Sequence, residues 1–365
     1  MNYFIKNLLF EIFKFLPAYD YPSLCLCCKS FNECMKQEQF WKYKCYQECL
    51  NFYVINQLGY YECYKLFYQL TKFKKKFNLK ESVIQIHNMK ILYLCDRRIK
   101  DIPKIISNLQ NLDELYFNNN TINKIPKGLG NLHNLKILNL FDNEIEKIPK
   151  ELGNLQNLTG LSVHFNKIKV IPKELGKLLN LKYLDLSGNE IMEIPMELSN
   201  LQNLLYLQVK NNVIKVIPKE LSNLQKLKRL FLNSNYIKEI PKELGKLLNL
   251  RELNLDNNDI NEIPKELGNL HNLIDLYLQA NEINEIPKEL GDLQNLQDLS
   301  FKNNHIKEIP KELANLQNLL LLNIQNNLIK EIPEVMTNLQ NLQVFLYDKN
   351  RVISIPKQLK NLVGY

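Results

Sequence analysis

Apolar residues recur along most of this chain in a pattern that repeats every 23 residues. The repeat is clearest in NLKYLDLSGNEIMEIPMELSNLQ, beginning at Asn180, where leucine or isoleucine fills positions 1, 4, 6, 11, 14, 18 and 21 counted from Leu181. One weaker unit begins at Met89, so twelve units fill residues 89 to 364. The first leucines of the other units are Leu112, Leu135, Leu158, Leu181, Leu204, Leu227, Leu250, Leu273, Leu296, Leu319 and Leu342. Units in one phase without insertions predict a stack with the same contacts at every step.

Each unit is expected to form one strand, one loop and one short outer turn. The spacing of apolar positions 1, 4 and 6 is typical of a strand, and the Ile-Pro step that follows places proline where a helical turn begins. A glycine or serine, as at Gly176 and Ser199, is expected to end that turn. One unit cannot bury enough apolar surface to fold alone, so stacking must pair the strands in a parallel sheet. Because the outer turns are bulkier than the strands, we expect the strands on the concave side.

Position 9 of the unit is asparagine in eleven of the twelve units, and Arg97 in the first. A buried turn leaves backbone groups unpaired, and the short amide of asparagine can both donate and accept hydrogen bonds. We therefore interpret these residues as a structural ladder. They are Asn120, Asn143, Asn166, Asn189, Asn212, Asn235, Asn258, Asn281, Asn304, Asn327 and Asn350.

The pattern LxxLxLxxNxIxxIPxxLGNLxN resembles the leucine-rich repeat family in its 23-residue form. The resemblance covers about three quarters of the chain. It implies an α/β solenoid, a twelve-unit horseshoe with a concave parallel sheet that binds other macromolecules. It does not imply which macromolecules these are.

The first residues of the chain follow a helical period instead. Apolar side chains step by three and four residues up to Leu16, and Pro17 then ends the helix. Asp20 is a suitable N-cap for a second helix, and Phe40-Trp41 with Cys45 anchors a later one. A helical module of this size needs a partner, or the end of the solenoid, to cover its apolar faces.

The run from Phe4 to about residue 46 resembles an F-box. Asp20, Cys28-Lys29, Phe31 and Trp41-Lys42 fall in register with that pattern, whereas Phe4-Ile5 replaces the usual Leu-Pro and Asn7 the usual glutamate. The resemblance implies docking onto the Skp-type linker protein of cullin-RING ubiquitin ligases. Alternatively, these helices only cap the solenoid. By position, the implied contacts with the linker are Leu8, Leu9, Ile12, Phe13, Leu16, Pro17 and Leu24.

These patterns divide the chain into three parts. Residues 1–46 form the F-box-like helical module, residues 47–88 a helical connector and N-terminal cap, and residues 89–365 the solenoid. Aromatic residues from Tyr60 to Phe77 keep a helical period within the connector.

Charge and hydropathy exclude several classes of function. A net charge of +8 over 365 residues, without a concentrated basic stripe, does not indicate nucleic-acid binding. The apolar N-terminus is interrupted by Lys6, Glu11 and Lys14, which fits neither a signal peptide nor a membrane span. We expect a cytoplasmic protein. The lysines between residues 72 and 76 leave open a nuclear signal, or only a solvated helix end.

The cysteines and histidines offer candidate chemistry. All eight cysteines lie within the first 95 residues, and Cys25, Cys28, Cys45 and Cys49 approach the spacing of a zinc ribbon. The second pair is one residue too wide and no glycine-rich knuckle accompanies either pair, so we expect buried, reduced thiols and no metal or cofactor. No histidine has a nucleophile or carboxylate pair at a recognised spacing, so we expect no enzymatic activity.

The variable strand positions 3, 5 and 7 are the candidate binding residues, because packing does not dictate them. Aromatic and basic residues dominate units three to seven, and acidic residues dominate units eight to ten. Such side chains suit an interface centre and the orientation of a basic segment, although each single residue could be ordinary surface variation. These candidates are Phe141, His164, Tyr183, Tyr206, Lys210, Arg229, Phe231, Glu252, Asp256, Asp275 and Asp298.

Two functional hypotheses follow. In the first, the chain is the non-catalytic substrate-recognition subunit of a cullin-RING ubiquitin ligase, with the linker protein on its helices and a protein target on the concave face. In the second, it is a protein-binding scaffold unconnected to ubiquitin, and the N-terminal helices are only a cap.

Overall fold

The computed structural model of the chain describes residues 35–49, 51–52, 58–348 and 351–362. The chain forms two compact units. The first comprises Met1–Met89 and Asn108–Asn111, and the second comprises Lys90–Ser107 and Leu112–Tyr365.

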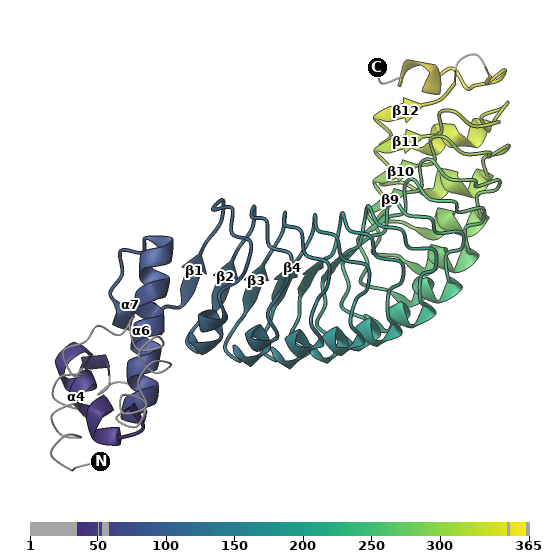
Figure 1. The fold of residues 1–365 in the computed structure, drawn as a ribbon. Coiled ribbons are helices and arrows are strands. Elements are labelled where there is room, and N and C mark those ends of the chain that lie inside the picture. The colour runs from purple at the N-terminus through teal and green to yellow at the C-terminus, as the bar shows by residue number, and fades with distance from the viewer. Residues whose placement is uncertain (1–34, 50, 53–57, 349–350, 363–365) are drawn as a thin grey trace, which may run out of the picture. The chain divides into compact units, whose positions relative to one another are not determined.

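The described part of the first unit is helical. Its α-helices are α4 (Glu38–Glu48), α6 (Tyr60–Phe77) and α7 (Val83–Asn88), drawn in purple and blue in Figure 1. Helix α7 begins at a capping box, in which the Ser82 hydroxyl accepts a hydrogen bond from the Gln85 amide and the Gln85 side chain accepts one from the Ser82 amide. Helix α6 ends at Asn78, which has the left-handed backbone conformation that commonly terminates helices.

Aromatic contacts hold α4 against α6. The Trp41 ring of α4 lies edge-on to Tyr61, with ring centroids 4.8 Å apart, and 5.5 Å from the ring of Tyr64. The Glu48 carboxylate at the end of α4 accepts a 2.7 Å hydrogen bond from the Tyr64 hydroxyl. The helix predicted around Phe40, Trp41 and Cys45 is therefore present, with these three side chains buried.

The second unit is built on one parallel sheet. Its twelve described strands follow each other in sequence order, and each pairs with the next at an offset of one repeat, as in Tyr183↔Tyr206. The strands are β1 (Ile91–Tyr93), β2 (Glu114–Tyr116), β3 (Ile137–Asn139), β4 (Gly160–Ser162), β5 (Tyr183–Asp185), β6 (Tyr206–Gln208), β7 (Arg229–Phe231), β8 (Glu252–Asn254), β9 (Asp275–Tyr277), β10 (Asp298–Ser300), β11 (Leu321–Asn323) and β12 (Val344–Leu346).

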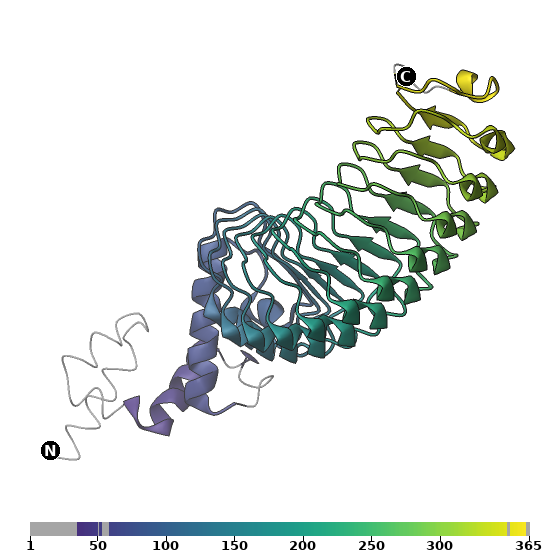
Figure 2. The ribbon, with the colours of Figure 1, turned by 90° about the vertical axis from the view of Figure 1, so that its right-hand side faces the viewer.

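Short 3-10 helices line the opposite side of this unit, so that the sheet lies along the inside of the curve and the helices along the outside (Figures 1 and 2). The expected α/β solenoid with a concave parallel sheet is confirmed. The described 3-10 helices are η2 (Lys104–Asn108), η3 (Lys127–Asn131), η4 (Lys150–Asn154), η5 (Lys173–Lys177), η6 (Met196–Asn200), η7 (Lys219–Asn223), η8 (Lys242–Lys246), η9 (Lys265–Asn269), η10 (Lys288–Asp292), η11 (Lys311–Asn315), η12 (Glu334–Asn338) and η13 (Leu359–Asn361).

The apolar positions of the repeat form the core between the two layers. In the unit that begins at Leu181, the side chains of Leu184, Leu186, Ile191 and Leu198 are fully buried. Since every interior unit buries apolar side chains at these positions, including Phe117 and Phe301 at position 6, one continuous apolar core runs along the stack. No unit therefore needs to be stable alone.

The asparagine ladder satisfies the backbone of the loops. The Asn212 amide donates hydrogen bonds to the carbonyl oxygens of Leu186, Val209 and Lys210, at 3.0 to 3.2 Å, and its side-chain oxygen accepts one from the Ile191 amide at 3.0 Å. Leu186 and Ile191 belong to the preceding unit, so each asparagine connects two units. The predicted structural role is confirmed for the described asparagines; Asn350 lies outside the described residues.

The residue before each ladder asparagine turns the backbone sharply. Position 8 has a left-handed conformation in all eleven units whose position 8 is described, with φ between 51° and 62°. Asparagine, aspartate and glycine tolerate this conformation best. The occupants are Asp96, Asn119, Asp142, Phe165, Gly188, Asn211, Ser234, Asn257, Ala280, Asn303 and Asn326.

One local expectation was wrong. Gly176 and Ser199 do not end the outer turns, because they lie inside η5 and η6 and neither has a positive φ. Instead, Gly176 lies directly beneath the next unit, where a Cβ atom would overlap the carbonyl oxygen of Glu197. Small residues at this position therefore set how closely neighbouring outer helices approach.

The ladder can be tested with Asn212→Ala. The substitution removes four hydrogen bonds, three of them buried, and leaves carbonyl and amide groups of two units unpaired, which should cost about 2 to 4 kcal/mol. Urea denaturation followed by circular dichroism measures the loss. Asn223→Ala, at an exposed asparagine in the same unit, is the control and should shift the midpoint little. Equal shifts for both variants would contradict the ladder's role.

Candidate functional site on the concave face

Strand positions 3 and 5 present their side chains on the concave face, whereas position 4 enters the core. In β6, for example, Tyr206 and Gln208 are partly exposed and Leu207 is buried. Neighbouring parallel strands lie about 4.8 Å apart, so residues one repeat apart become direct neighbours. The concave face is therefore a set of rows.

An aromatic group occupies the face at β3 and β4. The Phe141 and His164 rings are stacked, with centroids 4.6 Å apart and planes 8° apart, and Phe165 lies edge-on to His164 at 5.2 Å. Two polar side chains hold the His164 ring in place: its Nδ1 lies 2.7 Å from the Ser162 hydroxyl and 3.4 Å from the Asp185 carboxylate.

Phe165 is a candidate binding residue that was not predicted from the sequence. Its side chain is 55% exposed although its backbone is left-handed, with φ of 52°, a conformation rare for bulky residues. Gly188, at the same position of the next unit, leaves room for the ring, since a Cβ there would lie 2.5 Å from Phe165 Cδ1. Because position 8 is left-handed in every unit where it is described, this conformation belongs to the repeat. Exposure of the Phe165 ring beside His164 is what makes it a candidate binding residue.

Ser162, His164 and Asp185 are the residue types of a hydrolytic triad, but their geometry is different. Both Ser162 and Asp185 approach the same ring nitrogen, Nδ1, whereas a triad needs the serine at one nitrogen and the carboxylate at the other. The Ser162 side chain is also buried. These contacts orient the His164 ring; they do not assemble a nucleophile.

Two tyrosines and an arginine form a second row, at position 3 of the units that contain β5 to β7. Tyr183 donates a 3.0 Å hydrogen bond to Asp185, and burial, followed by the nearby Asp185 charge, raises the pKa of Tyr183. Its ring centroid lies 6.4 Å from that of Tyr206. The Arg229 guanidinium lies over the Tyr206 ring at 5.6 Å and its Nε is 3.1 Å from the Glu252 carboxylate.

Lys210 and Phe231 are also partly exposed at positions 7 and 5 of their units. They extend the same surface beside Tyr206 and Arg229. The positions chosen from the sequence between units three and seven are thus neighbours in adjoining rows.

Three carboxylates form an acidic row at position 3 of β8 to β10. Glu252 pairs in register with Asp275, and Asp275 with Asp298. Burial raises the pKa of Asp275 to about 6, with further contributions from the Asp298 and Glu252 charges that outweigh the opposing charge of Arg229. Tyr277 donates a 3.4 Å hydrogen bond to Asp298.

Asp256 differs from these three carboxylates. It is only 9% exposed, and it accepts hydrogen bonds from the backbone amide of Gln279 at 2.7 Å and from the Gln279 side chain at 3.0 Å. Burial raises its pKa in spite of these bonds. Asp256 supports the loop of the next unit, so the acidic row consists of Glu252, Asp275 and Asp298.

The linker-contact residues lie in a different part of the chain. Leu8, Leu9, Ile12, Phe13, Leu16, Pro17 and Leu24 are all outside the described residues.

Family comparisons agree with this architecture. Models of a leucine-rich repeat region match residues 50–180 and 170–273, a further leucine-rich repeat model matches residues 248–306, and an F-box domain model matches residues 6–43. Both families are typically non-catalytic modules that bind other proteins. No match is found among curated proteins. Over the described residues, no helix is long and apolar enough to cross a membrane.

Solved structures show the same solenoid. A leucine-rich repeat protein of Leptospira interrogans is 36% identical, with a TM-score of 0.73 over 78% of this chain and 72% of that one. The plant peptide hormone receptor RGFR1, in complex with RGF2, is 33% identical, with a TM-score of 0.69, and the match covers 77% of this chain and 49% of that one. An internalin of Listeria monocytogenes is 27% identical, with a TM-score of 0.68, and the match covers 76% of this chain and 81% of that one.

The repeats, the concave parallel sheet and these matches define a leucine-rich repeat solenoid. The chain belongs to the leucine-rich repeat proteins, and it carries an F-box domain at residues 6–43.

The acidic row predicts a distinctive dependence of stability on pH. Asp275 has a folded-state pKa of about 6, whereas an unperturbed aspartate has a pKa of about 3.9. Folding therefore takes up a proton between these values, and stability falls as pH rises through that window. Asp275→Asn removes this contribution, because the groups that face it, Glu252, Asp298, Arg229 and Tyr277, then meet a neutral amide. The variant should gain stability relative to the parent at pH 7 and lose that gain near pH 4.

Urea midpoints measured at several pH values test this expectation. Asp259→Asn, at an exposed loop carboxylate, controls for the change in net charge. An Asp275→Asn variant that is less stable than the parent at pH 7 would show that the carboxylate is stabilised by its surroundings and would refute the assignment.

Proposed function

We propose that this protein is the substrate-recognition subunit of a cullin-RING ubiquitin ligase. Its F-box docks onto the Skp-type linker protein, and its concave face binds a protein target. The observation that carries the proposal is that one chain joins an F-box at residues 6–43 to a solenoid whose concave face gathers aromatic residues, an arginine and an acidic row.

The chemistry of the face suggests what kind of segment it binds. Aromatic side chains and arginine contribute strongly to interface centres, so the surface from Phe141 to Phe231 suits apolar or aromatic side chains of the target. Burial, and then the charges of Asp298 and Glu252, raise the pKa of Asp275, and a target lysine or arginine would offset these carboxylate charges. The acidic row therefore suits a basic residue of the target.

The spacing of the strands sets the distance between these contacts. Tyr206 in β6 and Asp275 in β9 are three strands apart, or about 14 Å at 4.8 Å per step. An extended chain advances about 3.3 Å per residue. A target segment lying across the strands would therefore place its apolar and basic residues about four residues apart.

A similar solenoid supports ligand binding by this repeat architecture. The plant peptide hormone receptor RGFR1, whose structure resembles this one, was solved in complex with RGF2. The likeness supports ligand binding by a solenoid of this kind, while the identity of the target here depends on this chain's own side chains.

One observation favours the alternative of a scaffold without ubiquitin. The F-box begins with Phe4-Ile5 and Asn7 where Leu-Pro and glutamate are usual, and these residues fall among the first contacts with the linker. In that case the helices only cap the solenoid. Deleting residues 1–46 separates the two ideas, since loss of a pure cap unfolds the solenoid, whereas loss of a docking module leaves it folded without ligase association.

Docking is tested directly by the double change Leu9→Glu and Ile12→Glu in the full-length chain. Two charges on the apolar docking surface should abolish co-purification with the Skp-type linker protein, with circular dichroism nearly unchanged, because neither residue belongs to the solenoid core. Gln39→Glu, at an exposed position of α4, is the matched control and should bind the linker as the parent does. Undiminished binding of the linker protein by the double variant would contradict the docking proposal.

A further inference from the structure

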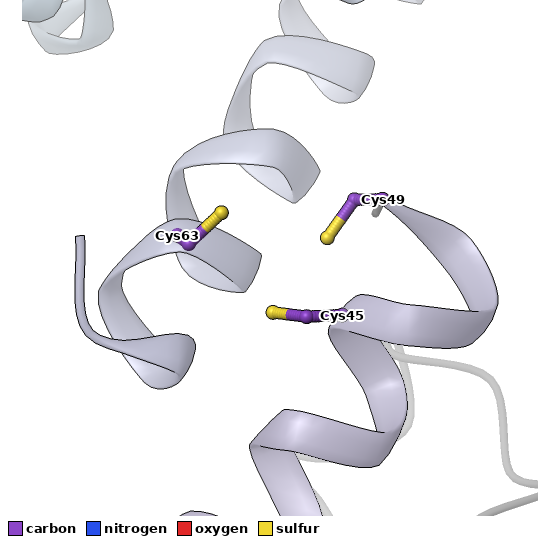
Figure 3. Close-up of side chains that lie close together, drawn as sticks. All are labelled: Cys45, Cys49 and Cys63. Atoms are coloured by element: carbon purple, nitrogen blue, oxygen red, sulfur yellow. The ribbon is translucent and has the colours of Figure 1, made fainter. Parts of the chain in front are cut away.

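Three buried cysteines converge between α4 and α6. Cys45 lies in the last turn of α4, Cys49 directly follows that helix, and Cys63 lies in the first turn of α6. Their Sγ atoms all lie within 4.8 Å of one another, and Figure 3 shows the three sulfur atoms directed toward a common point. The residues are 0%, 4% and 0% exposed, respectively.

The local sequence explains why the sulfur atoms meet. Cys45 and Cys49 are four residues apart, a spacing that places both side chains on one face of a helix. Cys63 faces them because Trp41 and Glu48, which flank Cys45 along α4, both contact Tyr64, the residue after Cys63 in α6. Ligands on paired helices are held more precisely than ligands on loops.

We propose that Cys45, Cys49 and Cys63 form a trithiolate site for a thiophilic divalent cation of the zinc type. This departs from the expectation of no metal, which rested on the four-cysteine spacing that includes Cys25 and Cys28. The proposed site uses Cys45 and Cys49, the second pair of that pattern, together with Cys63. Cys25 and Cys28 lie outside the described residues.

The distances fit such an ion. A zinc-sulfur bond is about 2.3 Å, so sulfur atoms in a tetrahedral site lie about 3.8 Å apart. The three sulfurs, at separations up to 4.8 Å, need to move together by about 1 Å or less, which small rotations about the side-chain bonds provide.

The chemistry of the ligands selects the cation. Thiolates are soft ligands that favour zinc-like and copper(I)-like ions over magnesium or calcium. Binding one divalent ion releases three thiol protons to solvent and leaves a complex of net charge minus one, whereas a monovalent ion would leave minus two. Because the site is buried, the smaller residual charge is favoured. The described residues contribute these three ligands, which leaves one tetrahedral position for a further donor.

The site would fasten α4, which lies at the end of the F-box match, to α6. An ion that binds the folded state more tightly than the unfolded state stabilises the fold, by an amount that grows with the logarithm of its affinity. The structure thus assigns to this cluster the role of a structural metal site that links α4 to α6 within the first unit.

Titration of the reduced full-length protein with Cd²⁺ tests the proposal without the ligase. We expect thiolate-to-metal charge-transfer absorption that saturates at one equivalent, loss of that absorption on addition of excess chelator, and a rise in melting temperature. Cys63→Ser should abolish the one-equivalent saturation. Cys95→Ser, at a cysteine of the first repeat that is outside the cluster, should preserve it. Saturation that is unchanged in Cys63→Ser would overturn the proposal, as would no saturation in the parent.

A second measurement does not depend on whether Cys63→Ser folds. X-ray absorption is recorded on protein with one equivalent of Zn²⁺, in a variant whose other N-terminal cysteines, Cys25, Cys27, Cys28 and Cys34, are serine. Three sulfur neighbours at about 2.3 Å support the site. Fewer than three, or a disulfide between any two of Cys45, Cys49 and Cys63 in the isolated protein, would rule it out.

Discussion

The need to pair the backbone of every loop with the next unit is the constraint on which the solenoid depends. An asparagine such as Asn212 can serve two units at once because its amide both donates and accepts, and no apolar side chain could replace it. The same geometry imposes a left-handed residue before each asparagine and a fixed offset of 23 residues between paired strands. The binding surface follows from this regularity, because equivalent positions of successive units become rows on the concave face.

The sequence reveals those parts of the fold that repeat. Apolar periodicity predicts the strands, the aliphatic core and the stacking direction, because burial must recur identically in every unit. It does not report backbone conformation, so the left-handed position was not predicted, although its frequent Asn, Asp and Gly residues carried the signal. Gly176 was expected to end an outer turn, but it is small because Glu197 of the next unit approaches it closely. That contact depends on how two units pack, which the sequence pattern of one unit does not report.

The candidate site was predictable only in part. Rows of variable residues such as Tyr206, Arg229 and Asp275 could be chosen because their neighbours lie one repeat away. Phe165 was missed because its exposure depends on a strained turn and on the space left by Gly188. Cys63 was missed because it meets Cys45 and Cys49 across a helix pair, and no local spacing encodes that contact.

The central claim is that the concave face, through its aromatic and acidic rows, binds a protein target. The most direct measurement places a photo-crosslinking amino acid at Tyr206 on the concave face, or at Met196 on the exposed outer helix η6, in full-length protein in cells. The account predicts a discrete crosslinked partner from Tyr206 alone. This partner should be lost when Asp275 and Asp298 become lysine, but not when the exposed loop residues Glu262 and Glu285 do. The same partner crosslinked from Met196, or one that is indifferent to reversal of the acidic row, would contradict the account.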